Sequence, residues 1–294
     1  MLGVIFGAMA VMLVLTVPIG VMLLAVALIP SLMDPGFTAT VPFVLRNVVG
    51  GLNSTPLLAI PLFILGGIIM AQSGIAKKLF DVFAYLIGDK TGGMPCASII
   101  TCLFYGAISG SAPATTAAVG TMTIPILDDM GYDHAFNAST VAIAGGLGVI
   151  IPPSVPFIVY SMASGASVGD MFLAGVIPGI LIALCLMIYA VYYCKTKGED
   201  KERIRNRVAV LREKGFLGVL KSSFWALLSP IIILGGIYGG IVTPTEAALI
   251  GVFYAALVGL FIYRTLRPKD LILLCVEAVK TTAPMLLVIG AASA

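Results

Sequence analysis

The sequence predicts an all-α protein that crosses a membrane several times. Of its 294 residues, 60% are hydrophobic and only 11% are charged, whereas about a quarter of the residues in a soluble domain are charged. The mean hydropathy is +1.10. Apolar stretches follow one another along most of the chain, and one helical crossing needs roughly 20 such residues. This pattern disfavours a nucleic-acid-binding protein and a soluble enzyme.

Nine apolar runs are bounded by glycine, proline or charged residues. They predict membrane helices at 2–16, 18–33, 55–72, 96–127, 137–163, 174–194, 224–242, 245–263 and 273–294. The run 96–127 is too long for one simple crossing and is interrupted at Ser109-Gly110-Ser111-Ala112-Pro113, which predicts a re-entrant hairpin with its tip at this turn. We therefore expect about eight crossings and one hairpin.

The run 137–163 predicts a broken helix. Gly145-Gly146-Leu147-Gly148 weakens its middle, and Pro152-Pro153-Ser154 cannot continue a regular helix. Irregular backbone at membrane depth is tolerated only where it is buried in protein or lines a polar cavity. Two interrupted elements in succession therefore predict two halves of one site.

Two polar segments predict the orientation in the membrane. Residues 75–90 form an amphipathic helix at the membrane surface, with Leu79, Val82, Phe83, Leu86 and Ile87 on its apolar face. Residues 195–221 hold nine Lys or Arg against four acidic residues and are expected to form a cytoplasmic loop. Counting crossings back from this loop places the N-terminus in the periplasm. Both ends of a re-entrant hairpin lie on the same side of the membrane, so Lys77 and Lys78 are expected on the cytoplasmic side.

Two helix pairs, 1–33 and 224–263, predict an internal repeat. Each has a proline-containing turn at its middle, and each pair is followed by a similar short sequence, at Ser54–Leu58 and Thr282–Leu287. The first pair is predicted to start on the periplasmic side of the membrane and the second on the cytoplasmic side. Two similar units of opposite orientation form an inverted repeat, as in many secondary transporters. On this interpretation roughly 120 residues of the second repeat are absent. Either the chain is incomplete or the repeat interpretation is wrong.

The hairpin tip carries the residues that could bind an ion or a substrate. Ser109, Ser111, Thr115 and Thr116 supply four hydroxyl groups. Hydroxyl and carbonyl oxygens suit a small cation, and an adjoining helix N-terminus suits a carboxylate. The alternative is that small residues merely allow close helix packing.

Catalytic and metal-binding patterns are missing from the apolar runs. The sequence has no H-E-x-x-H motif and no pair of acidic residues in a membrane segment, and we expect its one histidine, His134, to be solvated at a surface junction. Thr243-Pro244-Thr245-Glu246 predicts a capping box at a helix start, which explains the Glu246 carboxylate. An intramembrane enzyme is therefore disfavoured.

Six motifs in this order resemble the large membrane subunit of the tripartite ATP-independent periplasmic (TRAP) transporters, the DctM family. They are Leu57–Ile64, Gly106–Ser111, Gly131-Tyr132, Ile151–Ser154, Ser167–Phe172 and Thr243–Ala248. The resemblance implies an elevator-type secondary transporter of the wider ion-transporter superfamily in the bacterial inner membrane. It also implies a sodium gradient as the driving force and no other cofactor. The implied partners are a small four-helix membrane subunit, a periplasmic substrate-binding protein and an organic acid such as a dicarboxylate or sialic acid.

The resemblance also implies roles for individual residues. Sodium binding falls on Ser109, Gly110, Ser111, Gly146, Gly148 and Pro152. Substrate binding falls on Ser111, Pro113, Thr115, Pro153 and Ser154. Members of the family continue with a second hairpin and two more helices, so this chain is expected to lack half of the substrate site.

The predicted organisation has five segments. They are scaffold helices of the first repeat at 1–74, a cytoplasmic arm helix at 75–91, half of the transport domain at 92–194, the basic cytoplasmic loop at 195–222 and scaffold helices of an incomplete second repeat at 223–294. Two alternatives stay open. One is a related anion and sodium symporter that needs no binding protein, and the other is a truncated membrane component that does not transport.

Overall fold

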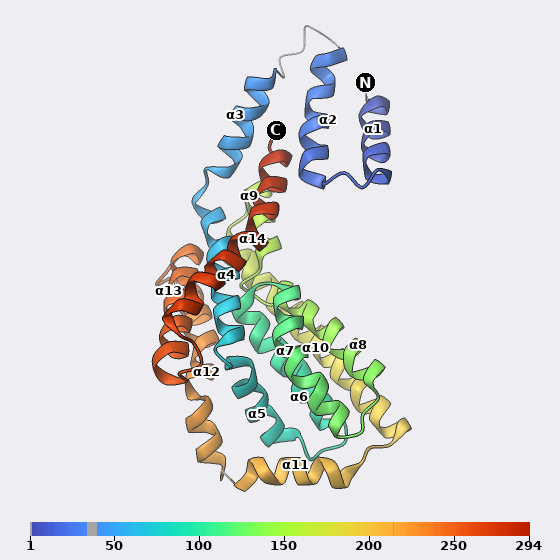
Figure 1. Ribbon diagram of the computed structural model, residues 1–294, viewed down its shortest axis with the longest axis vertical. Helices are drawn as coiled ribbons and strands as arrows, with labels where there is room; N and C mark the ends of the chain where they lie inside the picture. Colours follow the sequence, from blue (N-terminus) through green and yellow to red (C-terminus); the bar gives the residue numbers. More distant parts are fainter. Residues whose placement is uncertain (1, 34–39, 214) are drawn as a thin grey trace. The chain divides into compact units, whose positions relative to one another are not determined.

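The chain is helical throughout the residues that the structure describes. A computed structural model describes residues 2–33, 40–213 and 215–294, and within these ranges there is no strand. Figure 1 shows the helices, which are α1 Leu2–Val14, α2 Ile19–Met33, α3 Val41–Leu52, α4 Ala59–Gln72, α5 Ile75–Ile87, α6 Gly93–Ser109, α7 Ala112–Asp129, α8 His134–Gly145, α9 Val155–Ser164, α10 Val168–Lys197, α11 Lys201–Glu213, α12 Gly215–Tyr238, α13 Pro244–Leu257 and α14 Pro268–Ala292. Short turns of other helix types are η1 Thr55–Leu58, η2 Gly146–Val149 and η3 Val258–Ile262. The all-α prediction is confirmed.

The chain divides into two compact units. One comprises Met1–Leu58 and Val276–Ala294, and the other comprises Ala59–Cys275. In the first unit the last turns of α14 pack closely on α2 and α3. A Cβ atom added to Gly20 would lie 3.0 Å from the Leu287 side chain, and one added to Gly290 would lie 3.1 Å from the Leu52 side chain. The second unit contains the hairpin and the broken helix.

Five helical segments are long and apolar enough to cross a membrane. Among the described residues they are Thr55–Gln72, Val168–Lys197, Gly215–Tyr238, Pro244–Ile262 and Pro268–Ala292. Their outward side chains include large hydrophobic groups such as Ile177, which is 77% exposed, and Ile188, which is 70% exposed. Such surfaces suit lipid rather than water. The prediction of a multi-pass membrane protein is confirmed. Helix α1, with 13 residues, is about 20 Å long and is shorter than the hydrocarbon layer.

The long run 96–127 is a helical hairpin, as predicted. Helix α6 ends at Ser109, Gly110 adopts a left-handed conformation with φ of +62°, and Ser111 is the N-cap of α7. Glycine adopts such a φ without strain, so it makes the sharp reversal possible. The two helices have 17 and 18 residues, and each is therefore about 26 Å long.

The run 137–163 is broken where the sequence predicts. Helix α8 ends at Gly145, one 3₁₀ turn covers Gly146–Val149, and α9 starts at Val155. The segment 150–154 between them is irregular, since neither Pro152 nor Pro153 can donate a backbone hydrogen bond. Figure 1 shows α6, α7, α8 and α10 running alongside one another in the second unit.

Two segments predicted as connections contain helices. Helix α3 lies within 34–54, and α11 lies within the basic segment 195–222, so the connection predicted there contains a helix. Its cytoplasmic location stays a prediction. Helix α11 forms because Ile204 and Val208 give this highly charged segment a buried apolar stripe. Residues 34–39 and 214 lie outside the described part of the chain.

The amphipathic helix 75–90 is present as α5, but more of it is buried than predicted. Leu79 and Val82 are buried as expected, whereas Leu86 is 49% exposed. The adjacent face is also covered, since Phe80 and Ala84 belong to a hydrophobic core with Met94 of α6. Helix α5 is therefore packed inside the protein along much of its length.

The capping box at the start of α13 is confirmed. The Glu246 backbone N–H donates to Thr243 Oγ1 at 3.3 Å, and the Thr243 backbone N–H donates to Glu246 Oε2 at 2.7 Å. These bonds satisfy two backbone donors that the first helical turn leaves without partners. Glu246 therefore has a structural role at this position.

Candidate ion and substrate site

The hairpin tip and the break in the next helix lie against each other. The Val155 N–H, at the start of α9, donates to the Gly110 carbonyl at an N···O distance of 3.5 Å. A Cβ on Gly110 would lie 2.8 Å from the Pro153 carbonyl oxygen, so only glycine fits this contact. The two interrupted elements therefore meet at one place.

The backbones of the hairpin and the 3₁₀ turn touch just below the tip. A Cβ on Gly106 would lie 2.7 Å from Gly148 Cα and 3.0 Å from Gly148 N. A Cβ on Gly148 would in turn lie 2.4 Å from Thr115 Oγ1 and 2.8 Å from the Ser111 carbonyl oxygen. Glycine at both positions lets α6 and α7 approach the broken helix closely.

Three hydroxyl-bearing residues form a buried oxygen cluster at the tip. Thr115 Oγ1 donates to the Ser111 carbonyl at 2.8 Å and lies 2.8 Å from Ser109 Oγ. Ser109 Oγ also lies 3.4 Å from the Ser111 carbonyl. The Ser109 and Thr115 side chains are fully buried. The cluster therefore gathers uncharged oxygen atoms, the ligand type that a hard cation prefers.

Several helix ends point their backbone groups into the same region. The last turn of α6 ends at Ser109, α7 begins after Ser111, and α9 begins after Ser154. A helix C-terminus carries partial negative charge on its carbonyls, and an N-terminus carries partial positive charge on its N–H groups. The site thus offers acceptors for a cation and donors for an anion without any ionised side chain among the predicted residues.

The remaining predicted residues differ in their placement. Pro152, Pro153 and Ser154 are buried beside the tip, and the Ser154 hydroxyl donates to the Val149 carbonyl at 2.6 Å. Pro113 is exposed. A Cβ on Gly146 would meet no other part of the described chain within 4 Å. Gly146 and Pro113 therefore lie at the margin of the cluster.

Helix α4 also contributes to the site, which the sequence did not predict. The Tyr105 hydroxyl donates to the Gly67 carbonyl at 2.7 Å, and Tyr105 is fully buried. A Cβ on Gly67 would lie 2.9 Å from Ser109 Cβ. The Gly66-Gly67 pair within an apolar run was the signal for this close approach.

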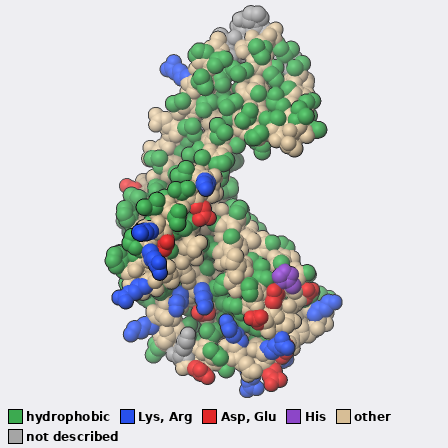
Figure 2. All heavy atoms as spheres, in the orientation of Figure 1, with side chains coloured by type: hydrophobic (Ala, Val, Ile, Leu, Met, Phe, Trp, Pro, Cys, Tyr) green, Lys and Arg blue, Asp and Glu red, His purple; other side chains and the backbone are tan. Residues whose placement is uncertain are grey.

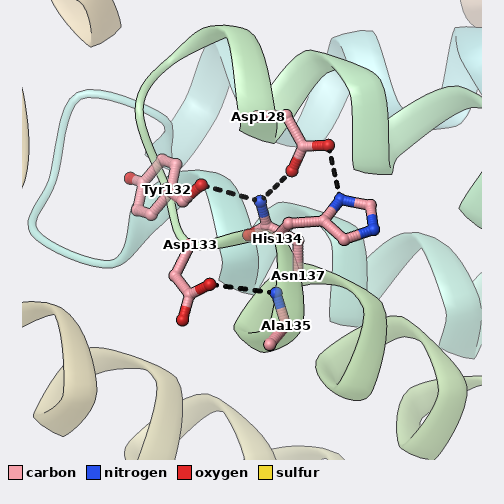
Figure 3. A network of polar contacts seen from close by, with 6 residues as sticks. All are labelled: Asp128, Tyr132, Asp133, His134, Ala135 and Asn137. Atoms are coloured by element: carbon pink, nitrogen blue, oxygen red, sulfur yellow. Dashed lines mark hydrogen bonds and ion pairs between the residues drawn. The ribbon is translucent and has the colours of Figure 1, made fainter.

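The junction between α7 and α8 holds a polar network. Figure 3 shows the Asp128 carboxylate between His134, whose Nδ1 lies 2.8 Å from Oδ2, and Asn137, whose side-chain amide donates to Oδ1 at 2.7 Å. The His134 side chain is 74% exposed, which confirms the predicted solvated position. The hydrogen bonds from Asn137 and then His134 lower the pKa of the Asp128 carboxyl. The network fastens the hairpin base to the broken helix.

We expect Asn137→Asp to destabilise the protein by roughly 2 kcal/mol at pH 7. The buried amide donor would become a second carboxylate beside Asp128. A carboxyl with a lowered pKa stabilises the fold above its unfolded pKa, and this stabilisation is lost as pH falls through the folded pKa. The wild type therefore keeps this stabilisation down to about pH 4. The variant gains stability as pH falls toward 4, because its two carboxyls then share a proton.

Thermal unfolding of both proteins between pH 7 and pH 4 measures this effect. The difference in unfolding temperature should narrow toward pH 4. Asn206→Asp, at an exposed position of α11, is the matched control and should unfold like the wild type. A difference that does not change with pH would contradict the carboxylate repulsion.

The sequence matches one protein family over nearly its whole length. Residues 6–294 match the family described as the tripartite ATP-independent periplasmic transporter, DctM component. This match includes the hairpin, the broken helix and every residue of the oxygen cluster.

Individual relatives agree with the family match. The chain is 40% identical to the isethionate TRAP transporter permease protein DctMQ of Oleidesulfovibrio alaskensis over 99% of this chain and 45% of that protein. It is 42% identical to the C4-dicarboxylate TRAP transporter large permease protein DctM of Pseudomonas aeruginosa, over 80% of this chain and 53% of that protein. It is 34% identical to the sialic acid TRAP transporter large permease protein SiaM of Vibrio cholerae, over 98% of this chain and 66% of that protein. The chain thus spans about half the length of the first two relatives, and all three are named as transporter subunits rather than enzymes.

Proposed function

Because the chain belongs to the DctM component family of the tripartite ATP-independent periplasmic transporters, we propose that it forms the large permease subunit of a secondary importer of a small organic acid. The subunit works in the bacterial inner membrane. The observation that carries the proposal is the meeting of the hairpin tip with the broken helix, because discontinuous helices with free backbone groups form the substrate sites of many secondary transporters.

The proposed substrate is a small anion. The relatives are named for isethionate, C4-dicarboxylates and sialic acid, which all carry a negative charge. The N-termini of α7 and α9 would receive the anionic group, and Ser111, Pro113, Thr115, Pro153 and Ser154 would border it. The exposed position of Pro113 supports an opening toward the substrate path.

The proposed coupling ion is sodium. The buried hydroxyl groups of Ser109 and Thr115 and the Ser111 carbonyl fit a monovalent cation by their chemistry. Gly110, Gly146, Gly148 and Pro152 would complete the site with backbone carbonyls or by allowing close approach. In this cluster a cation would compete with the present hydrogen bonds among these oxygens, so binding requires a small rearrangement of the hydroxyl groups.

The proposed mechanism is an elevator movement in which the hairpin and broken helix carry the bound anion across the membrane. A periplasmic binding protein would deliver the substrate, and a small four-helix membrane subunit would complete the permease. The inverted repeat and the division into scaffold and transport segments belong to the same proposal. The close packing of the hairpin on the broken helix supports movement of these two elements together.

Uptake by proteoliposomes containing the full-length permease and its small subunit tests the proposal. Uptake of the radiolabelled acid should require both a sodium gradient and the binding protein. Uptake that is unchanged without the binding protein would favour the alternative of a binding-protein-independent symporter. Uptake that is unchanged when choline replaces sodium would contradict sodium coupling.

We expect Ser111→Ala to weaken sodium coupling about fivefold. Ser111 Oγ accepts from the Ala114 N–H at 3.5 Å, a long bond, so its loss affects the helix start only slightly. The sodium concentration for half-maximal uptake should therefore rise while the protein keeps its unfolding temperature. Ser222→Ala on α12 is the matched control, and a sodium dependence equal to that of the control would remove the Ser111 hydroxyl from the site.

A further inference from the structure

A polar cavity lies beside α11, away from the candidate ion and substrate site. Its volume is about 390 Å³, and its charged lining residues are Asp89, Lys90, Glu199, Lys201, Arg205 and Arg212. Four of these side chains are basic and two are acidic. Figure 2 shows basic and acidic side chains gathered over the end of the second unit that contains α11.

The acidic groups of the cavity are already engaged within the protein. Asp89 Oδ2 accepts from Arg212 Nη2 at 2.7 Å, and this pair lowers the pKa of the Asp89 carboxyl. Glu199 Oε1 accepts from the Gly92 N–H at 2.9 Å and from the Tyr132 hydroxyl at 2.6 Å. These contacts hold both carboxylates in place.

Three basic groups of the cavity have no such partner. Within the described part of the chain, Lys90, Lys201 and Arg205 form no ion pair with a carboxylate. Lys201, Arg205 and Arg212 are spaced so that they share one face of α11, while Lys90 comes from the turn between α5 and α6. Positive charge therefore converges on the cavity from two separate elements.

Both walls of the cavity are fixed by packing. Ile204 and Val208, which lie beside the basic residues on α11, are buried in a core with Phe80, Met94 and Leu127 and hold this helix in place. The opposite wall is equally constrained, because a Cβ on Gly92 would lie 2.9 Å from the Val191 backbone. A preformed cavity of this kind loses little entropy when it binds a ligand, unlike flexible lysines on an open surface.

We propose that this cavity binds a phosphate group through Lys90, Lys201 and Arg205. A phosphate carries acceptor oxygens for all three cations, and guanidinium and ammonium groups bind it through charge-assisted hydrogen bonds. Two sources share this chemistry, the headgroup of an anionic lipid such as phosphatidylglycerol and a free phosphate. Basic pockets on the cytoplasmic side of membrane helices bind lipid headgroups. The proposal does not depend on the transport activity proposed above.

Ligand titration of the full-length protein in phosphatidylcholine nanodiscs tests the site. One arm adds phosphatidylglycerol to the nanodiscs, and the other adds inorganic phosphate to the buffer. Thermal unfolding and native mass spectrometry measure binding in each arm. We expect the double variant Lys90→Gln/Lys201→Gln to bind about twentyfold more weakly, since each removed cation near the membrane surface weakens binding severalfold.

The matched control is Lys221→Gln/Lys269→Gln, which removes the same charge from exposed positions that do not line the cavity. A loss confined to the cavity variant in the lipid arm assigns the site to a lipid headgroup, and a loss confined to the phosphate arm assigns it to free phosphate. Equal affinities of the two double variants in both arms would overturn the proposal. Arg205→Gln alone provides a second test that leaves the α5–α6 turn unchanged, and it should weaken binding about fivefold.

Discussion

Replacing Gly106 by alanine is expected to destabilise the protein by about 2 kcal/mol and to reduce uptake at least about tenfold. The new Cβ would lie 2.7 Å from Gly148 Cα, and its three nearest atoms are all backbone atoms. Rotation of a side chain cannot relieve such a clash, so α6 and the 3₁₀ turn must separate. Separation would also move Ser109 and the Ser111 carbonyl away from the broken helix, which disrupts the proposed sodium site.

Uptake in proteoliposomes and thermal unfolding in detergent measure the two effects. Gly235→Ala is the matched control, because Gly235 lies in α12 and no heavy atom outside its own helix and chain neighbours lies within 4 Å of its Cβ position. Alanine favours a helix over glycine, so the control should be as stable as the wild type or more so. A Gly106→Ala protein with normal stability and uptake would show that the hairpin does not need this close contact.

The turn and the break were predictable from the sequence because both depend on local chemistry. Gly110 between two serines permits a left-handed turn, and Pro152-Pro153 interrupts a helix wherever it stands. The position of each break therefore follows from a few adjacent residues. The contact between the breaks does not, because the approach of Gly106 to Gly148 depends on how whole helices pack.

Helix α11 shows what the charge pattern of a segment does not predict. The segment 195–222 is rich in Lys and Arg, and this pattern predicts a cytoplasmic connection but not the helix within it. Two buried side chains, Ile204 and Val208, are enough to dock it on a core formed by α5, α6 and α7. Such docking depends on partners distant in sequence, as do the bonds of Glu199 to Gly92 and Tyr132. Tertiary contacts therefore decided the structure of this segment.

The proximity of the site residues does not by itself establish that they bind an ion. The structure places Ser109, Thr115 and Gly148 together, but hydroxyl clusters also form where helices merely pack closely. The two interpretations differ in what removal of one hydroxyl does. If the cluster only packs, losing the hydroxyl changes stability alone, whereas an ion site also loses sodium affinity.

Thr115→Val is therefore expected to raise the sodium concentration for half-maximal uptake about tenfold and to destabilise the protein by about 2 kcal/mol. Thr115 Oγ1 has a single proton, which it donates to the Ser111 carbonyl, so the Ser109 hydroxyl is left to donate to Thr115. Valine has the same shape but removes both bonds at a fully buried position. The larger methyl group would also press against Gly148.

Sodium titration of uptake, together with thermal unfolding, separates the two roles of Thr115. Thr121→Val on the same helix is the matched control, because the Thr121 hydroxyl is exposed and donates only to the Ala117 carbonyl. Thr115→Ser restores the hydroxyl without the methyl group, so it should recover most of the sodium affinity even if some stability is lost. A Thr115→Val protein that is destabilised but keeps the sodium dependence of Thr121→Val would show that the cluster serves packing, and the ion would then have to bind elsewhere.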